Sequence, residues 1–341
     1  MAAERAPLSA GRLALWTAVL LAVLACALVL GAALGAGDVS LSDFFGPDSS
    51  RRTILLEVRL PRVLLAAVLG SALCVAGISF QALLRNPLAD PYVLGVSGGA
   101  SIGGVVALLL GFGIGEGIFD RIAVPAFAFG GALGALVLIE WIATVGGRLT
   151  VYTLLLTGAI FNAFSAALLY FIQSLASLEQ LHAIVFYLMG QVPVFGYRVL
   201  GGLALASFLA ALALFSMARD FNALSLGEEG ALQLGVDVER IKRRTFLLGS
   251  LLTGLSVSVA GLVGFVGLVV PHLLRLLLGP DHRLLLPAGF FGGAAFLVLA
   301  DLFARTITAP NELPVGVVTA LVGGPFFLYL LRSRGGRRGN F

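Results

Sequence analysis

The stretch LPRVLLAAVLGSALCVAGISFQAL, residues 60–83, is an apolar run with one charged side chain, Arg62. A helix of about 20 mostly apolar residues spans the hydrocarbon core of a bilayer. Runs of the same kind occur elsewhere, at about 13–36, 92–111, 121–145, 150–174, 194–217, 243–264, 266–279, 284–304 and 314–332. The run at 266–279 is short and interrupted by glycine and proline. The sequence therefore predicts an all-α polytopic membrane protein of about ten transmembrane helices.

Composition supports lipid as the solvent. Of the 341 residues, 59% are hydrophobic and only 12% are charged, whereas soluble domains carry roughly 25% charged residues. The 44 glycines suit a membrane bundle, because small residues let helices approach closely in lipid. We expect such contacts at Gly99-x-x-x-Gly103 and Gly130-x-x-x-Gly134, and one domain over residues 1–341.

The first apolar run has some features of a signal peptide. Arg5 and Arg12 precede it, and Val23-Leu24-Ala25-Cys26 resembles a lipoprotein cleavage box. The run continues to Ala36, beyond the 7–15 residues of a signal core, so we expect a retained helix. The two cysteines lie inside apolar runs, which excludes a disulfide scaffold.

Basic residues predict the orientation of the chain. Placing the N-terminus in the cytoplasm puts most of the 22 Lys and Arg residues inside, as the positive-inside rule requires. With ten spans, both termini are then cytoplasmic: the N-terminus at 1–12 and a basic tail at 333–341. Two related halves are also indicated, since at an offset of 184 residues Gly70, Val75-Ala76-Gly77, Pro87 and Leu94-Gly95 align with Gly254, Val259-Ala260-Gly261, Pro271 and Leu278-Gly279. Copies five spans apart would be inverted, as in many transporters.

The most polar internal segment is 219–244, which mixes acidic and basic residues. Glycines at 227, 230 and 235 bracket pieces too short to span a bilayer. We expect two short amphipathic helices on the cytoplasmic face. They form either a solvated connection or a docking surface for a soluble partner.

Enzymatic chemistry has little support. A phosphate-binding loop needs the pattern G-x-x-x-x-G-K-[ST], but the only lysine, Lys242, is followed by Arg243 and lacks those glycines. Gly95-Val96-Ser97-Gly98 matches a serine-protease pattern that needs an activating histidine. The histidines are His182, His272 and His282, in separate parts of the sequence. An intramembrane serine hydrolase is therefore a remote alternative.

An ion-coupled secondary transporter is the other alternative, since intramembrane acids often mark ion paths. Only Glu140 and Asp301 fall within runs, both toward run ends. Asp301 is four residues before Arg305 and would pair with it on one helix face. Arg59, Arg62 and Arg305 depart from the orientation rule, because they lie at the outer ends of spans. They either anchor in headgroups or bind carboxylates of a partner.

Several long motifs resemble the FecCD family of ABC importer permeases. They appear in the family's order over about residues 50–333 and include Arg59-Leu60-Pro61-Arg62, Arg85-Asn86-Pro87-Leu88-Ala89-Asp90-Pro91, Gly264-Phe265-Val266-Gly267-Leu268-Val269-Val270-Pro271-His272 and Glu312-Leu313-Pro314-Val315-Gly316. The resemblance implies a permease of ten helices that pairs as a homodimer in the bacterial cytoplasmic (inner) membrane. It also implies two ABC ATPase subunits and an extracytoplasmic binding protein as partners. The expected cargo is a metal chelate: ferric siderophore, haem or vitamin B12.

The resemblance also implies roles for particular residues. Arg59, Arg62 and Arg305 would meet glutamates of the binding protein. The coupling segment, within 219–242, would be seated in the ATPase through Leu226, Gly227, Glu228, Ala231, Leu234 and Gly235. Gates are expected at Thr150 and Val151 and at Asn86 and Leu88. The B12 permease pattern has two hydroxyl residues at the first gate, from which Val151 departs.

No catalytic, metal or cofactor site is expected on this chain. ATP and Mg²⁺ would be bound by the partner ATPase, whose closure would move residues 226–235 and shift the gates. The sequence shows no chelating cluster of Cys, His or acidic residues, so the pathway suits a bulky preformed chelate rather than a bare ion. The shared motifs do not specify which chelate is carried.

Overall fold

The computed structural model describes residues 10–35, 49–113 and 118–335. The predicted terminal segments at 1–12 and 333–341 therefore lie largely outside the described residues. The chain is almost entirely helical, with one short antiparallel hairpin, β1 (Thr144–Val145) and β2 (Arg148–Leu149). The helices are α1 (Ala10–Ala33), α2 (Ser49–Thr53), η2 (Ile54–Arg59), α3 (Leu60–Leu83), η3 (Pro91–Leu94), α4 (Val96–Leu109), α5 (Ile118–Ala143), α6 (Val151–Leu175), α7 (Leu178–Met189), α8 (Tyr197–Ser216), α9 (Ala218–Leu224), α10 (Glu228–Gln233), α11 (Val238–Ala260), α12 (Val266–Leu278), α13 (His282–Thr306) and α14 (Val315–Gly335).

The membrane fold is confirmed. Among the described residues, six helices are long and apolar enough to cross a membrane, and four shorter apolar helices accompany them. The span predicted at 60–83 begins earlier, because α2, η2 and α3 form one continuous helix over Ser50–Leu83. α7 was not predicted, and it lies in the predicted connection between spans five and six. Its N-terminus is closed by a capping box between Ser177 and Gln180.

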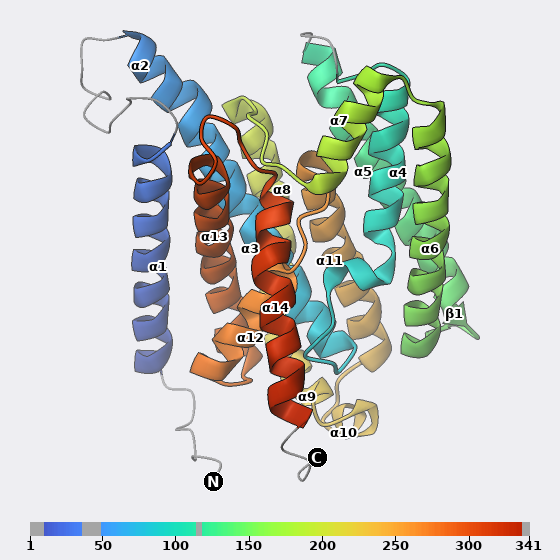
Figure 1. The fold of residues 1–341 in the computed structure, drawn as a ribbon. Coiled ribbons are helices and arrows are strands. Elements are labelled where there is room, and N and C mark those ends of the chain that lie inside the picture. Colours follow the sequence, from blue (N-terminus) through green and yellow to red (C-terminus); the bar gives the residue numbers. More distant parts are fainter. Residues whose placement is uncertain (1–9, 36–48, 114–117, 336–341) are drawn as a thin grey trace.

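Two helices form the centre of the bundle (Figure 1). Nearly all of α3 is buried, and α11 is buried along most of its length. α11 occupies most of the predicted span at 243–264 and is less apolar than the other long helices. Its buried Thr245, Thr253 and Ser256 donate to carbonyls four residues earlier at 2.7–2.8 Å. These bonds satisfy the three hydroxyl groups, so α11 carries Thr245, Thr253 and Ser256 inside the bundle with their donors paired.

Glycines set the closest helix contacts. A Cβ at Gly99 would lie 2.5 Å from the carbonyl oxygen of Gly131, and one at Gly103 would collide with the carbonyl of Phe127. The prediction is therefore correct for Gly99 and Gly103, which pack α4 against α5. It is wrong for Gly130 and Gly134, where a Cβ would meet nothing within 4 Å. The α5 glycine that faces α4 is Gly131, because helical periodicity turns its neighbours away.

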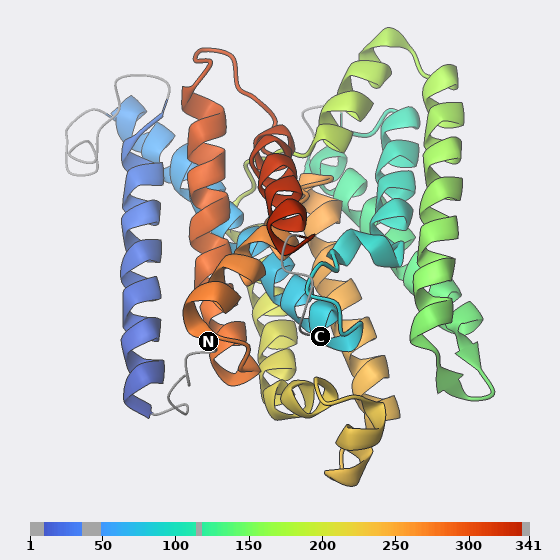
Figure 2. The same ribbon diagram turned by 60° about the horizontal axis from the view of Figure 1, so that its bottom comes forward.

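The two ends of the bundle carry different helices. The beginning of α1 and the end of α14 lie at the same end as α9 and α10 (Figure 1), and α2 and α7 lie at the opposite end. Figure 2, in which the first end comes forward, shows residues 218–233 projecting there from the bundle. This arrangement agrees with the expectation that both termini share a side with the segment at 219–244. The two expected short helices of that segment are α9 and α10.

The repeat prediction is only partly consistent with the elements. Gly70 and Gly254 lie in the central helices α3 and α11. Pro87, however, lies in the turn after α3, whereas its counterpart Pro271 lies inside α12. At a constant offset of 184 residues, the two aligned prolines therefore lie in different kinds of structural element. The repeat stays a prediction.

Candidate functional site

An arginine cluster lies at the α2–α7 end, around Asp301 of α13. Asp301 is 1% exposed and accepts from Nε and Nη2 of Arg62 at 3.1 and 3.0 Å. Its other oxygen lies 2.9 Å from Nε of Arg305, which confirms the pair expected on one face of α13. Buried charges are stable when paired in this way, so Asp301 holds two arginines of different helices together.

The other contacts of this cluster attach it to α1. Arg59 donates from Nη1 to the carbonyls of Ala32 and Ala33 at 3.3 and 3.2 Å, and Arg305 donates from Nη2 to Gly31 at 3.1 Å. The last carbonyls of a helix lack intrahelical partners, and cationic side chains stabilise that end of the helix dipole. Arg59 and Arg305 therefore fix the end of α1 against α3 and α13.

Only part of the cluster reaches the surface. Arg59 and Arg305 are 5% and 4% exposed, and Arg62 is 13% exposed. Arg62 also donates from Nη1 to Glu312 at 2.7 Å, and the Glu312 side chain is 47% exposed. The three predicted docking arginines are thus brought together by the fold, with Arg62 and Glu312 at the surface. Glu312 was not predicted as a partner of Arg62, although it lies in one of the family motifs.

The predicted coupling segment presents leucines to the surroundings at the other end of the bundle. Leu226, Leu232 and Leu234 are 69%, 59% and 63% exposed. Ala231 is fully buried and fixes α10 against the bundle. Gly227 precedes α10 and Gly235 follows it, at φ values of +101° and +80° that favour glycine. The segment therefore presents a cluster of exposed leucines on its outer face.

A chain of ion pairs connects this segment to α6. Glu228 of α10 lies 3.2 Å from Lys242 of α11, which lies 3.7 Å from Glu239. Glu239 accepts from the backbone N–H of Leu149 at 2.6 Å. Arg243 supports the same contact by pairing with Glu239 at 3.2 Å and donating to the carbonyl of Gly147 at 2.9 Å. Sequence reasoning missed Glu239 and the hairpin, because nothing in the sequence shows that two segments 90 residues apart meet.

The predicted gate residues lie at two separate places. Thr150 is the N-cap of α6 but makes no side-chain cap bond, and Val151 is the first residue of that helix. Asn86 and Leu88 lie in the turn between α3 and η3, where the Asn86 side chain accepts from the N–H of Leu88 at 3.0 Å. This bond closes an Asx turn. Thr150 follows Leu149 directly, so only the first pair adjoins the ion-pair chain.

Buried polar groups stabilise the turn that carries Asn86. Gln81 donates to the carbonyls of Ala89 and Gly267 at 3.2 Å each, and it accepts from Arg275 at 2.8 Å. Asp90 caps η3 by accepting from the N–H of Tyr92 at 2.8 Å. Burial raises the pKa of Asp90 to about 6, although this hydrogen bond opposes the shift. The turn is thus fixed to α12 and carries a group that titrates below neutral pH.

Ser97 and the histidines, on which the serine-hydrolase alternative depends, contact backbone, aromatic and amide groups. Ser97 donates to the carbonyl of Tyr92 at 3.5 Å. The ring contacts of His182 and His272 are with Phe186 and Phe326. His282 contacts Asn222 of α9 through Nδ1 at 2.8 Å. Within the described parts of the chain, no three His, Cys, Asp or Glu residues come together as metal ligands would.

Comparison with known proteins gives the family. Residues 19–333 match the model of the FecCD transport family. The chain is 41% identical to the uncharacterized ABC transporter permease YvrB of Bacillus subtilis, covering 92% of this chain and 93% of that protein. It is 39% identical to the hemin transport system permease HmuU of Yersinia pestis, covering 94% and 96%. It is also 42% identical to the vitamin B12 import system permease BtuC of Vibrio cholerae, covering 86% and 87%.

A solved structure has the same fold. It is assigned to the metal-chelate type of ABC transporter, in an inward-facing conformation, with a TM-score of 0.82. The two chains are 30% identical, and the match covers 94% of this chain and 99% of the solved one. Fold and sequence therefore agree along nearly the whole length. The chain belongs to the FecCD transport family and is a non-catalytic, multi-pass membrane permease of an ABC transporter.

Proposed function

We propose that two copies of this chain form the translocation pathway of an importer for a metal chelate, namely ferric siderophore, haem or vitamin B12. Two ABC ATPases bind at the α9–α10 end, and an extracytoplasmic binding protein docks at the α2–α7 end. That orientation places both termini in the cytoplasm. The ion-pair chain from Glu228 to Leu149 carries the proposal, since it joins the ATPase-facing segment to the helix on which we place a gate.

The coupling step follows from that chain of contacts. The exposed Leu226, Leu232 and Leu234 suit a hydrophobic cleft on the ATPase, because exposed apolar clusters on a polar face mark interaction sites. Movement of α10 would act on Lys242 and Glu239 through the contacts at 3.2 and 3.7 Å. Glu239 holds the residue just before Thr150, so the start of α6 would shift with it.

The cargo class rests on the relatives and on side-chain chemistry. HmuU is a hemin permease and BtuC a vitamin B12 permease, by their descriptions. The exposed side chains of α6 are mainly aromatic and aliphatic, including Tyr152, Phe164 and Tyr170 at 75%, 60% and 72%. A wall of this kind suits a bulky chelate whose metal is already coordinated, since bare cations need oxygen, nitrogen or sulfur ligands.

Docking of the binding protein would use the arginine cluster. Guanidinium groups bind carboxylates bidentately, and Asp301 already holds Arg62 and Arg305 in fixed positions. Arg62 is the most exposed of the three arginines, so it is the first that a partner's glutamate would reach. Arg59 and Arg305 would act chiefly by positioning this surface and the end of α1.

Reconstitution tests the proposal. Vesicles that contain this chain, its ATPase and its binding protein should accumulate a chelate only when ATP is supplied. Uptake by this chain alone, driven by an ion gradient, would overturn the scheme in favour of a secondary transporter. Titrating the binding protein with ferric siderophores, haem and cobalamin would identify the cargo.

A further inference from the structure

The end of α3 carries an arginine at a position that glycine usually occupies. The N–H of Arg85 donates to the carbonyl of Ala82 at 3.2 Å, and the N–H of Asn86 donates to the carbonyl of Gln81 at 3.1 Å. These two bonds form a Schellman motif, in which the residue after the helix adopts a left-handed conformation. Arg85 has a φ of +48°, which is uncommon for residues other than glycine. Glycine would close α3 with less strain, so the backbone does not explain the arginine.

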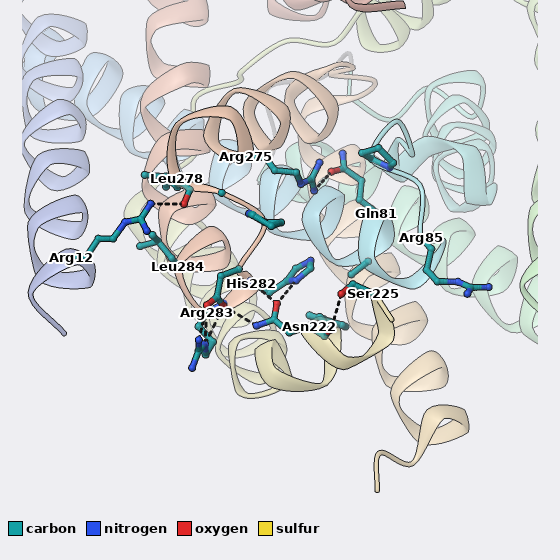
Figure 3. A pocket seen from close by; sticks show the side chains of 16 residues that line it. Arg12, Gln81, Arg85, Asn222, Ser225, Arg275, Leu278, His282, Arg283 and Leu284 are labelled. Atoms are coloured by element: carbon teal, nitrogen blue, oxygen red, sulfur yellow. Dashed lines mark hydrogen bonds and ion pairs between the residues drawn. The ribbon is translucent and has the colours of Figure 1, made fainter. Parts of the chain in front are cut away.

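The side chain of Arg85 points toward the coupling segment. A pocket of about 580 Å³ lies between the end of α3, α9 and the connection between α12 and α13. Arg85 lies at the rim of this pocket, and Figure 3 shows its guanidinium directed away from Arg275 and His282. A Cβ at Gly227, the residue before α10, would lie 3.5 Å from Nη1 of Arg85. Arg85 therefore reaches from α3 to the backbone at the start of α10.

The conformation of Gly227 suits this approach. Its φ of +101° is available mainly to glycine, and its N–H donates to the carbonyl of Leu224 at 3.0 Å. The chain thus turns from α9 into α10 beside the guanidinium with no side chain of residue 227 between them. A shift of the start of α10 would therefore act on Arg85 directly.

On its other side, Arg85 adjoins the turn on which we place the second gate. Asn86 follows directly, and its side chain accepts from the N–H of Leu88 at 3.0 Å. The carbonyl of Asn86 accepts from the N–H of Ala89 at 3.1 Å. Because these bonds close the turn on itself, a displacement of Arg85 would move the turn as a unit.

We propose that Arg85 is a positioning residue that transmits movement of the coupling segment to the second gate. This inference rests on the function proposed above, in which an ATPase moves α10. The ion-pair chain from Glu228 leads to Thr150, at the first gate. Gly227 is adjacent to Glu228, so Arg85 connects the same part of the segment to the second gate. Both gates would then respond to one movement of α10.

Cysteine labelling of the permease assembled with its ATPase in nanodiscs tests the inference. In a background without Cys26 and Cys74, Leu88→Cys reports on the second gate and Thr150→Cys on the first. The rate of labelling by a water-soluble maleimide is measured without nucleotide and with ATP and orthovanadate. Coupling between two sites corresponds to about 5- to 150-fold. With Arg85→Gly, the ATP-dependent change at Leu88→Cys should therefore shrink about fivefold or more, while the change at Thr150→Cys persists.

The melting temperature separates this role from a structural one. Because glycine adopts the left-handed conformation readily, Arg85→Gly should leave the apparent melting temperature unchanged or raise it, although the response of the second gate is lost. If Arg85→Gly does not fold, Arg85→Gln gives the same comparison. Arg198→Gln, exposed in the first turn of α8 and outside the coupling segment, is the matched control and should leave both reporters unchanged.

Three outcomes would overturn the inference. The first is an unchanged response of Leu88→Cys when Arg85 is replaced. The second is an equal loss at Thr150→Cys, which would mean that Arg85 is needed for the ATPase to bind or act. The third is that neither cysteine responds to ATP with Arg85 intact. In that case the proposed gates fail, and the inference fails with them, whereas the first two outcomes leave the proposed function standing.

Discussion

Glu239, in the first turn of α11, accepts a hydrogen bond of 2.6 Å from the backbone N–H of Leu149, the last residue before the N-cap of α6. Lys242 and Arg243 hold the same carboxylate at 3.7 and 3.2 Å. A single side chain thus connects the coupling segment with the helix of the proposed gate.

Replacing Glu239 tests whether this contact transmits movement. Glu239→Gln removes the negative charge that holds Lys242, Arg243 and the N–H of Leu149. Losing charge-assisted hydrogen bonds costs about 1.5–3 kcal/mol, so ATP-driven uptake should fall about tenfold or more while the ATPase still assembles and hydrolyses ATP. Uptake and hydrolysis are measured in the same proteoliposomes. Glu57→Gln, exposed on η2 and outside the coupling segment, is the matched control, and equal uptake by both variants would refute the coupling route.

Removing the carboxylate beside Arg62 tests the docking surface. Glu312 holds Arg62 at 2.7 Å and is 47% exposed, so it occupies the position that a partner's carboxylate would take. Exposed ion pairs contribute about 0.2–1 kcal/mol, and Glu312→Gln should therefore tighten the complex with the binding protein about twofold to fivefold. Surface plasmon resonance measures the affinity, with Glu57→Gln, exposed on η2, as control. Weaker binding by Glu312→Gln would show that Glu312 itself contributes to docking.

The raised pKa of Asp90 predicts a pH dependence of stability. The folded-state pKa of about 6 exceeds the usual 3.8, so folding takes up a proton between these values. The contribution of Asp90 is then full below about pH 4, is lost as the pH rises through 6, and stays lost above it. Asp90→Asn, which keeps a cap acceptor for Tyr92, should melt at a higher temperature than the unmodified protein at pH 8. The difference should shrink at pH 5.

The measurement is an apparent melting temperature in detergent at both pH values. Asp237→Asn, at the 55% exposed N-cap of α11, controls for loss of a capping charge. A difference between Asp90→Asn and the unmodified protein that does not change with pH would contradict the titration.

Cross-linking tests the position of the second copy. We place a gate at the start of α6, so the exposed face of that helix should line the pathway and face the partner. In a background without Cys26 and Cys74, Tyr152→Cys should form a disulfide between copies. Leu15→Cys, on α1 at the other side of the bundle (Figure 1), should not. Tyr152 and Leu15 are 75% and 61% exposed, so accessibility alone cannot explain a difference. Dimers through Leu15→Cys alone would place the interface on α1.

Much of the fold could be predicted from the sequence, because lipid imposes long apolar helices whose run lengths are visible directly. Contacts between distant segments could not, since nothing local marks Leu149 as a partner of Glu239 or Glu312 as a partner of Arg62. The span predicted at 243–264 corresponds to α11, but its burial at the centre of the bundle could not be predicted, since its serines and threonines make it less apolar than the outer helices. The polarity of the 219–244 segment indicated short helices correctly, but not which of its leucines face outward.

Gly130 and Gly131, which are adjacent in α5, test how closely α5 packs against α4. A Cβ at Gly131 would collide with the carbonyl of Gly99, whereas a Cβ at Gly130 would meet nothing within 4 Å. Overpacking a close contact costs about 1–3 kcal/mol, while Ala in place of an unconstrained helical Gly gains up to about 1 kcal/mol. Gly131→Ala should therefore lower the apparent melting temperature in detergent, and Gly130→Ala should leave it unchanged or raise it. Equal effects of the two substitutions would mean that α4 and α5 are not held together through Gly99 and Gly131.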